Sequence, residues 1–132
     1  MDVKLEKWFR PNIDKEVLKE LTKKSDIKGL IHVSIYFSLL IFVGYLAYFT
    51  WGTWWSVIWF YIYGNIFCFC NPIWHETGHK TAFKTKFLNE IFYHISCFMA
   101  YFEPTRWRFT HFVHHGNSYS TKNPYDHEIE YD

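Results

Sequence analysis

Leu30–Phe49 has the sequence LIHVSIYFSLLIFVGYLAYF and contains no Asp, Glu, Lys or Arg. As a helix, this stretch rises about 30 Å, which matches the thickness of the hydrocarbon core of a bilayer. A second apolar run, WWSVIWFYIYGNIFCFC at Trp54–Cys70, follows the short turn Thr50–Thr53 and is near the lower length limit for a span. No formal charge occurs from Gly29 to His75. The two runs therefore favour a transmembrane helical hairpin over a buried hairpin in a soluble protein.

The composition of the 132-residue chain fits one domain with an apolar centre and charged flanks. Its 14 basic and 13 acidic residues all lie outside the uncharged stretch. Aromatic residues make up 23% of the chain, with seven Trp and ten Tyr, and such side chains favour membrane–water interfaces. The net charge of +1 and the lack of a basic stripe argue against a nucleic-acid partner.

The distribution of basic residues predicts the orientation in the membrane. Eight Lys or Arg residues precede the first apolar run, six follow the second, and the connecting turn has none. The positive-inside rule therefore predicts an integral membrane protein with both termini in the cytoplasm. The first 30 residues are charged and lack the apolar core of a cleavable signal peptide.

Three further helices are predicted outside the hairpin. Asn12–Ser25 carries apolar residues at helical spacing among Lys and Glu, with Asn12 or Asp14 as its cap. Phe87–Phe102 is apolar but short, and it contains Glu90 and His94, so it fits an interfacial or re-entrant helix. Trp107–His115 reaches a stop signal at Gly116.

We therefore predict an all-α membrane protein. A transmembrane helical hairpin is followed by a short interfacial or re-entrant helix and by cytoplasmic helices that carry histidines. Within the single domain 1–132, the expected parts are an amphipathic N-terminal segment at 1–29, spans at 30–49 and 54–70, and a cytoplasmic part at 71–132 with its interfacial helix at about 87–102.

Two histidine boxes lie in the predicted cytoplasmic part. His75 and His79 form an H-x-x-x-H box, and His111, His114 and His115 form an H-x-x-H-H box. On a helix, residues three or four apart share one face, with Cβ atoms about 5–6 Å apart. A metal needs convergent lone pairs, so these five imidazoles are the predicted metal ligands. The residues alone indicate no catalytic side chain and no binding site for an organic cofactor.

The other histidines and the cysteines are weaker candidates. His32, His94 and His127 are more typical of structural or interfacial residues, although His94 and His127 can support a ligand from outside the first coordination shell. The three cysteines, Cys68, Cys70 and Cys97, do not form a metal-binding or disulfide pattern. Imidazole suits zinc, copper, iron and nickel, and five nitrogens exceed a four-coordinate structural zinc site.

A zinc protease is the main rival. His75-Glu76-Thr77-Gly78-His79 also satisfies H-E-x-x-H, in which the glutamate is the general base of a metalloprotease. A third zinc ligand would then come from the second box. A protease has no need of the H-x-x-H-H triple, however, and the short motif recurs by chance.

The two boxes and their surroundings resemble the membrane-bound fatty acid desaturases and the related alkane and fatty acyl hydroxylases. The similarity covers nearly the whole chain and corresponds to the N-terminal half of the family pattern. The apolar hairpin contributes to it, and the other segments that carry it are Ser25-Asp26-Ile27-Lys28-Gly29-Leu30, His75-Glu76-Thr77-Gly78-His79-Lys80-Thr81-Ala82-Phe83-Lys84-Thr85 and Pro104-Thr105-Arg106-Trp107-Arg108-Phe109-Thr110-His111-Phe112-Val113-His114-His115.

The resemblance implies a non-haem di-iron centre, held mainly by histidines on the cytoplasmic side. Such a centre uses O₂ and electrons from cytochrome b5, ferredoxin or rubredoxin to introduce a double bond or a hydroxyl group into a lipid chain. By position, His75 and His79 match the first box of the family, and His111, His114 and His115 match the second.

One departure from the family pattern concerns its third box. Family members carry a second pair of spans and a third histidine box, and neither occurs in this sequence. The chain alone is therefore expected to be inactive, with the remaining ligands supplied by a missing part or by a second chain. Whether the chain is an enzyme by itself stays open, and a non-catalytic truncated membrane protein is the third alternative.

Overall fold

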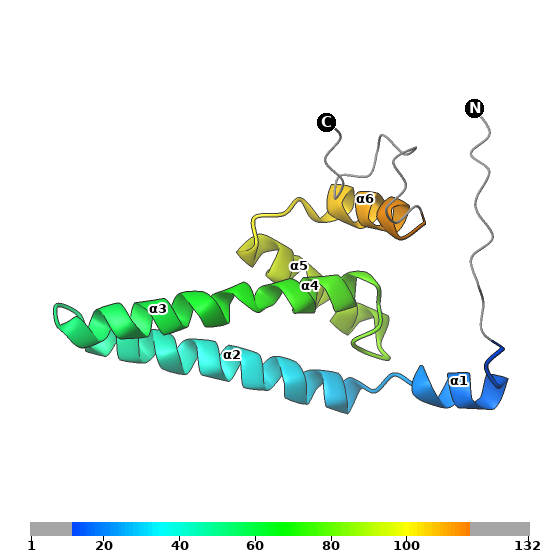
Figure 1. The fold of residues 1–132 in the computed structure, drawn as a ribbon, viewed down its shortest axis with the longest axis horizontal. Helices are drawn as coiled ribbons and strands as arrows, with labels where there is room; N and C mark the ends of the chain where they lie inside the picture. The colour runs from blue at the N-terminus through cyan, green and yellow to red at the C-terminus, as the bar shows by residue number, and fades with distance from the viewer. Residues whose placement is uncertain (1–11, 117–132) are drawn as a thin grey trace. The chain divides into compact units, whose positions relative to one another are not determined.

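The computed structural model describes residues 12–116, and its regular structure in that range is all helical, with no strand (Figure 1). This agrees with the predicted all-α class. The segment 24–102 forms one compact unit, and the flanking segments belong to another. The ends of the chain, including His127, lie outside the described residues. The helices are α1 (Lys15–Leu21), α2 (Asp26–Phe49), α3 (Trp54–Cys68), α4 (Cys70–Gly78), α5 (Lys86–Met99) and α6 (Pro104–Gly116).

The hairpin consists of α2 and α3, which run antiparallel and side by side (Figure 1). The side chain of Ser25 caps α2 by accepting from the N–H of Lys28 at 3.4 Å, so this helix begins four residues before the predicted span. Its buried residues recur every three or four positions, the spacing of one helical face. They are Val33, Tyr36, Leu40, Val43 and Ala47.

The remaining surface of the hairpin is exposed and mostly apolar. Two helical segments, Lys15–Phe49 and Trp54–Gly78, contain windows long and apolar enough to cross a membrane. Only 28% and 11% of those windows are buried within the protein. A core helix of a soluble protein is mostly buried, so this exposure favours the predicted transmembrane hairpin.

Pro72 explains why the second apolar helix divides. Proline has no N–H and its ring clashes with the carbonyl four residues earlier, which here belongs to Cys68. α3 ends at Cys68, and α4 begins at Cys70 after the single residue Phe69. α3 thus ends two residues before the predicted end of the span at Cys70, and the break lies between the apolar α3 and the helix that carries the first histidine box.

α5 packs against α4 and has two unlike faces. Phe87, Ile95 and Phe98 are exposed on one face. The opposite face is buried and more polar, with Asn89, Tyr93, Ser96 and Cys97. The helix ends at Met99, three residues before the predicted boundary. The exposed apolar side is compatible with the predicted interfacial or re-entrant position, which stays a prediction.

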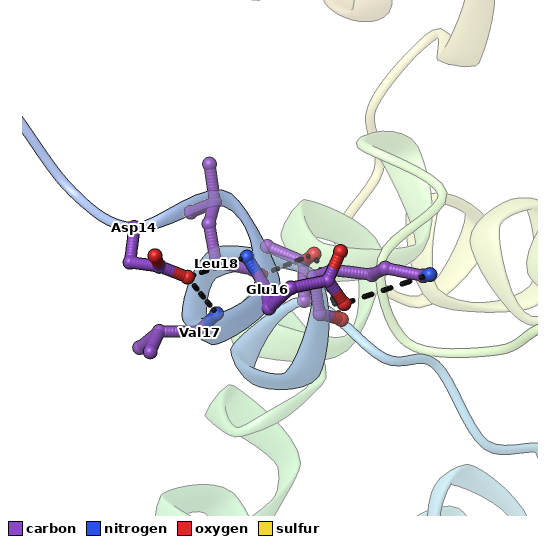
Figure 2. A network of polar contacts seen from close by, with 6 residues as sticks. Asp14, Glu16, Val17 and Leu18 are labelled. Carbon is purple, nitrogen blue, oxygen red and sulfur yellow. Dashed lines mark hydrogen bonds and ion pairs between the residues drawn. The ribbon is translucent and has the colours of Figure 1, made fainter.

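α1 is shorter than the predicted helix over Asn12–Ser25. The predicted alternative Asp14 is its cap, because its Oδ1 accepts from the backbone N–H of Glu16 at 2.8 Å and of Val17 at 3.3 Å (Figure 2). An exposed ion pair, with 3.9 Å between Lys19 Nζ and Glu16 Oε2, adds little stability. No residue of α1 is buried.

The start of α2 is tied to the loop between α4 and α5. The carboxylate of Asp26 accepts from both the backbone N–H and the hydroxyl of Thr85, each at 2.8 Å. Gly29 lies so close to this loop that an added Cβ would stand 2.6 Å from the carbonyl oxygen of Ala82 and from the ring of Phe83. Phe83 is fully buried and stacks on Phe92 with ring centroids 5.2 Å apart.

We expect Gly29→Ala to destabilise the fold, because the new methyl group must displace backbone as well as a buried ring. The free energy of unfolding should fall by about 1–3 kcal/mol. The measurement is reversible unfolding of the purified protein in detergent, followed by circular dichroism. Ser34→Ala, at an exposed position on the same helix, is the matched control. Equal stability of the two variants would show that the contact between α2 and the loop is looser than described.

Candidate metal centre

The first histidine box lies at the end of α4. His75 is in the last turns of this helix and His79 is its C-cap residue. Both side chains are half-buried. Their ring centroids are 4.9 Å apart and their ligand nitrogens lie within 4.8 Å of each other. The two imidazoles are therefore adjacent on one helical face, as their spacing predicted.

A specific helix end holds His79 in place. The N–H of Thr81 donates to the carbonyl of Glu76 at 3.0 Å, and the N–H of Lys80 donates to that of Thr77 at 2.9 Å. These two bonds define a Schellman motif, whose C′ residue is left-handed and is most often glycine. Here it is Lys80, with φ 59°. A left-handed residue with a side chain costs of order 1 kcal/mol, so other contacts must hold it.

Lys80 has such contacts on both sides. Its carbonyl accepts from Nζ of Lys24 at 2.6 Å, and its own Nζ lies 3.3 Å from Oε1 of Glu90 on α5. Oε2 of Glu90 is 4.0 Å from Nε2 of His94. Together with the Asp26–Thr85 pair, these contacts tie the end of the first box to α2 and α5. His94 therefore contacts a residue that holds the end of the box.

Asn89 completes this support from inside. Its buried amide donates to the carbonyls of Phe83 at 2.9 Å and Thr85 at 3.1 Å, and its Oδ1 accepts from the N–H of Phe83 at 3.2 Å. The side chain thus satisfies the backbone groups of a loop that would otherwise be buried without partners.

The second histidine box lies on α6. Glu103 precedes the helix, and its carboxylate accepts from the backbone N–H of Thr105 at 3.0 Å and from that of Arg106. These bonds favour the charged form, and the N–H of Arg106 is the largest cause that lowers the pKa of Glu103 below its usual value. A carboxylate at this end also complements the helix dipole.

Within the second box, His111 and His115 are the closest pair. Their Nε2 atoms are 3.0 Å apart, and their ring centroids are 4.5 Å apart. Two nitrogens bound to one metal at about 2.1 Å, and about 90° apart, are themselves about 3.0 Å apart. The same distance is that of a hydrogen bond between the two rings, so these nitrogens are as close together as two donors to one metal need to be.

His114 lies further from that pair, with ring centroids 6.1 Å from His111 and 5.8 Å from His115. His111 is buried, and Trp107 stacks on it at 4.3 Å with an interplanar angle of 19°. The stack fixes the plane of the His111 ring. The donor set of this box is all imidazole, which suits iron as well as zinc, copper and nickel.

Glu76 lines a cavity rather than the histidine pair of its own box. The cavity has a volume of about 230 Å³ and is also lined by Lys28 and His32 of α2, and neither His75 nor His79 belongs to the lining. The general base of a metalloprotease must reach the water on the metal. The position of Glu76 therefore does not favour the protease alternative.

A family comparison adds to this geometry. The sequence profile described as fatty acid desaturase matches residues 50–130, more than half of the chain. The chain belongs to the fatty acid desaturase family. The match includes both histidine boxes, so the resemblance inferred from them is confirmed. No curated protein and no solved structure matches this desaturase-family chain.

Three contributions to the site were not predicted from the sequence. The left-handed Lys80, the Asp26–Thr85 pair and the Trp107 stack all depend on backbone path or on tertiary packing. The available signal was that all four residues, Asp26, Lys80, Thr85 and Trp107, lie in segments that carry the family resemblance.

The cap at Glu103 predicts a pH dependence of α6. Its folded-state pKa is lowered, so the stability it contributes is present above the ordinary pKa of about 4.3 and is lost as the pH falls through the lowered value. Glu103→Ala should therefore be less stable than the parent protein at pH 7, and the difference should disappear in acid. Thermal unfolding at a series of pH values measures this. A difference that persists unchanged at pH 2 would contradict the cap.

Proposed function

We propose that this chain provides the first two histidine boxes of an O₂-dependent, non-haem di-iron lipid desaturase. His75, His79, His111, His114 and His115 are the proposed iron ligands. The proposal is carried by the desaturase-family match over both boxes, and it is supported by the 3.0 Å spacing of the His111 and His115 nitrogens.

With iron bound, such a centre would oxidise an unactivated C–H bond of a lipid chain. The product is a double bond or, in related hydroxylases, an alcohol. The residues of this chain would hold the proposed ligands in position. Trp107 orients His111, and the contacts of Lys80 hold the helix end at His79. Each ligand must be a neutral imidazole, so metal binding should weaken as the pH falls.

Five imidazoles do not complete two iron sites, because an octahedral metal takes about six donors. We propose that the remaining ligands come from further polypeptide, either a longer form of this chain or a second chain that carries another histidine box. The electron donor is proposed to be a protein such as cytochrome b5, ferredoxin or rubredoxin.

The proposed location is the membrane, with the histidine boxes and both termini in the cytoplasm. Two apolar helices support membrane insertion, and the basic residues on both sides of the hairpin support the orientation. The substrate is accordingly proposed to be the acyl chain of a membrane lipid or a related fatty acyl compound.

Metal binding tests the ligand assignment. Substitution of His111 or His115 by Ala should weaken binding of Co²⁺, a spectroscopic substitute for Fe²⁺, by at least about tenfold, because one donor of a pre-positioned pair is lost. His75→Ala and His79→Ala should do the same. Absorption spectra of the purified protein during cobalt titration provide the measurement.

His32→Ala is the control for this titration, since His32 lies outside both boxes. Its cobalt affinity should equal that of the parent protein. Unchanged affinity in the box variants, with normal helical content, would overturn the assignment of ligands.

Glu76→Gln separates lipid oxidation from proteolysis. A protease that uses Glu76 as general base would lose its peptide cleavage. The proposed desaturase should keep its metal affinity and, when the remaining ligands are supplied, at least about one third of its lipid conversion. Lipid analysis of membranes and a peptide-cleavage assay on the same preparations decide between them. Peptide cleavage that depends on Glu76 would contradict the proposal.

A further inference from the structure

One exposed face of α3 carries polar and small residues in the middle of an apolar helix. Tyr61, Gly64, Asn65 and Cys68 are all exposed and follow the spacing i, i+3, i+4 and i+7 of a single helical face. We call these four residues the Asn65 face. A Cβ added at Gly64 would meet no atom within 4 Å, so the surface beside Asn65 is open.

The opposite side of α3 packs against the rest of the hairpin. Tyr63, Ile66 and Phe67 pack against the buried cluster that includes residues of α2, and the carbonyl of Phe67 accepts from the hydroxyl of Tyr36 at 3.2 Å. The Asn65 face therefore points away from the hairpin partner.

In an inserted hairpin, Asn65 would lie deep in the hydrocarbon core, where an exposed amide is unfavourable. Trp51 and Trp54 are exposed at the turn, where such rings mark the edge of the hydrocarbon core. Asn65 follows Trp54 by eleven residues, a rise of about 16 Å, which is close to the middle of a core about 30 Å thick.

The amide of Asn65 is only partly bonded. Its Nδ2 donates to the carbonyl of Tyr61 at 2.7 Å, and this is its one hydrogen bond within residues 12–116. Its Oδ1 and second N–H have no hydrogen-bond partner among the residues that the structure describes. In hydrocarbon an unpaired amide is strongly unfavourable, and polar side chains at this depth face other protein segments.

We propose that the Asn65 face is the interface between α3 and the α3 helix of a second copy of this chain. This inference goes beyond the proposed desaturase function and requires only that α3 is inserted in a membrane. A copy inserted in the same direction places its own Asn65 at the same depth. A primary amide has both a donor and an acceptor, so two of them pair reciprocally across a twofold axis.

Gly64 supports the same interface. Glycine lets two transmembrane helices approach closely, and close approach brings the two amides within hydrogen-bond distance. The further polypeptide of the proposed function is the other candidate for this face. It would need its own polar group at this depth, whereas a second copy has one by identity, and the cross-link described below distinguishes the two.

Cys68 is a native reporter of this interface. It is exposed and lies one turn from Asn65, while Cys70 and Cys97 are buried. A twofold axis through the Asn65 face brings the two Cys68 side chains near each other. Oxidation of membranes that contain the whole chain, with copper phenanthroline, should then give a disulfide-linked species of twice the 16.2 kDa chain mass.

Variants of α3 and α2 test whether the cross-link depends on the Asn65 face. Cys68→Ser should abolish the dimer, Asn65→Leu and Gly64→Ile should each reduce it at least about fivefold, and Asn65→Gln should restore part of it. Ser38→Leu, a matched loss of an exposed polar side chain on α2, should leave it unchanged. All variants are compared in carbonate-washed membranes, so that only inserted protein is counted.

Three cross-linking results would overturn the proposal. They are the absence of a Cys68-linked dimer in the parent protein, an undiminished dimer in Asn65→Leu, and capture of a different protein through Cys68. Extraction of the chain by carbonate would also overturn it, by removing the membrane premise. None of these results depends on iron, so failure here is distinct from failure of the proposed desaturase function.

Discussion

The uncharged stretch from Gly29 to His75 is the constraint on which the rest of the structure depends. A backbone that crosses a bilayer finds no water for its N–H and C=O groups and must satisfy them within helices. α2 and α3 are long and apolar enough to meet this requirement, and most of the surface of their apolar windows is exposed rather than buried within the protein. Pro72 then interrupts the helix, and α4 carries the first histidine pair away from the apolar region.

The proposed iron ligands are arranged locally rather than by long-range packing. Each box lies at or near the end of one helix, and helical spacing alone brings its imidazoles together. Tertiary contacts then hold the helix end at the first box and one imidazole of the second box in place. Lys80 adopts a left-handed conformation held by Lys24 and Glu90, and Trp107 fixes the ring of His111. Strain of this kind is often found beside functional sites, where geometry matters more than stability.

The sequence predicted the helical class, the hairpin and the pairing of histidines within each box, because each depends on periodicity or on lack of charge. It did not predict the break at Phe69 as a boundary, the shortness of α1, or the Asp26–Thr85 contact. That contact joins positions 59 residues apart, and no local pattern specifies such a pair. Asn89 likewise reads as one polar residue on a helix, although it satisfies a buried loop.

Iron bound by both histidine boxes is the central claim, and the metal content of the protein tests it most directly. Protein purified without oxygen from membranes of cells grown with both iron and zinc should contain iron as its main transition metal. That iron should be lost when His75 and His111 are replaced together by Ala. Zinc as the main bound metal, or iron retained in that double variant, would contradict the account.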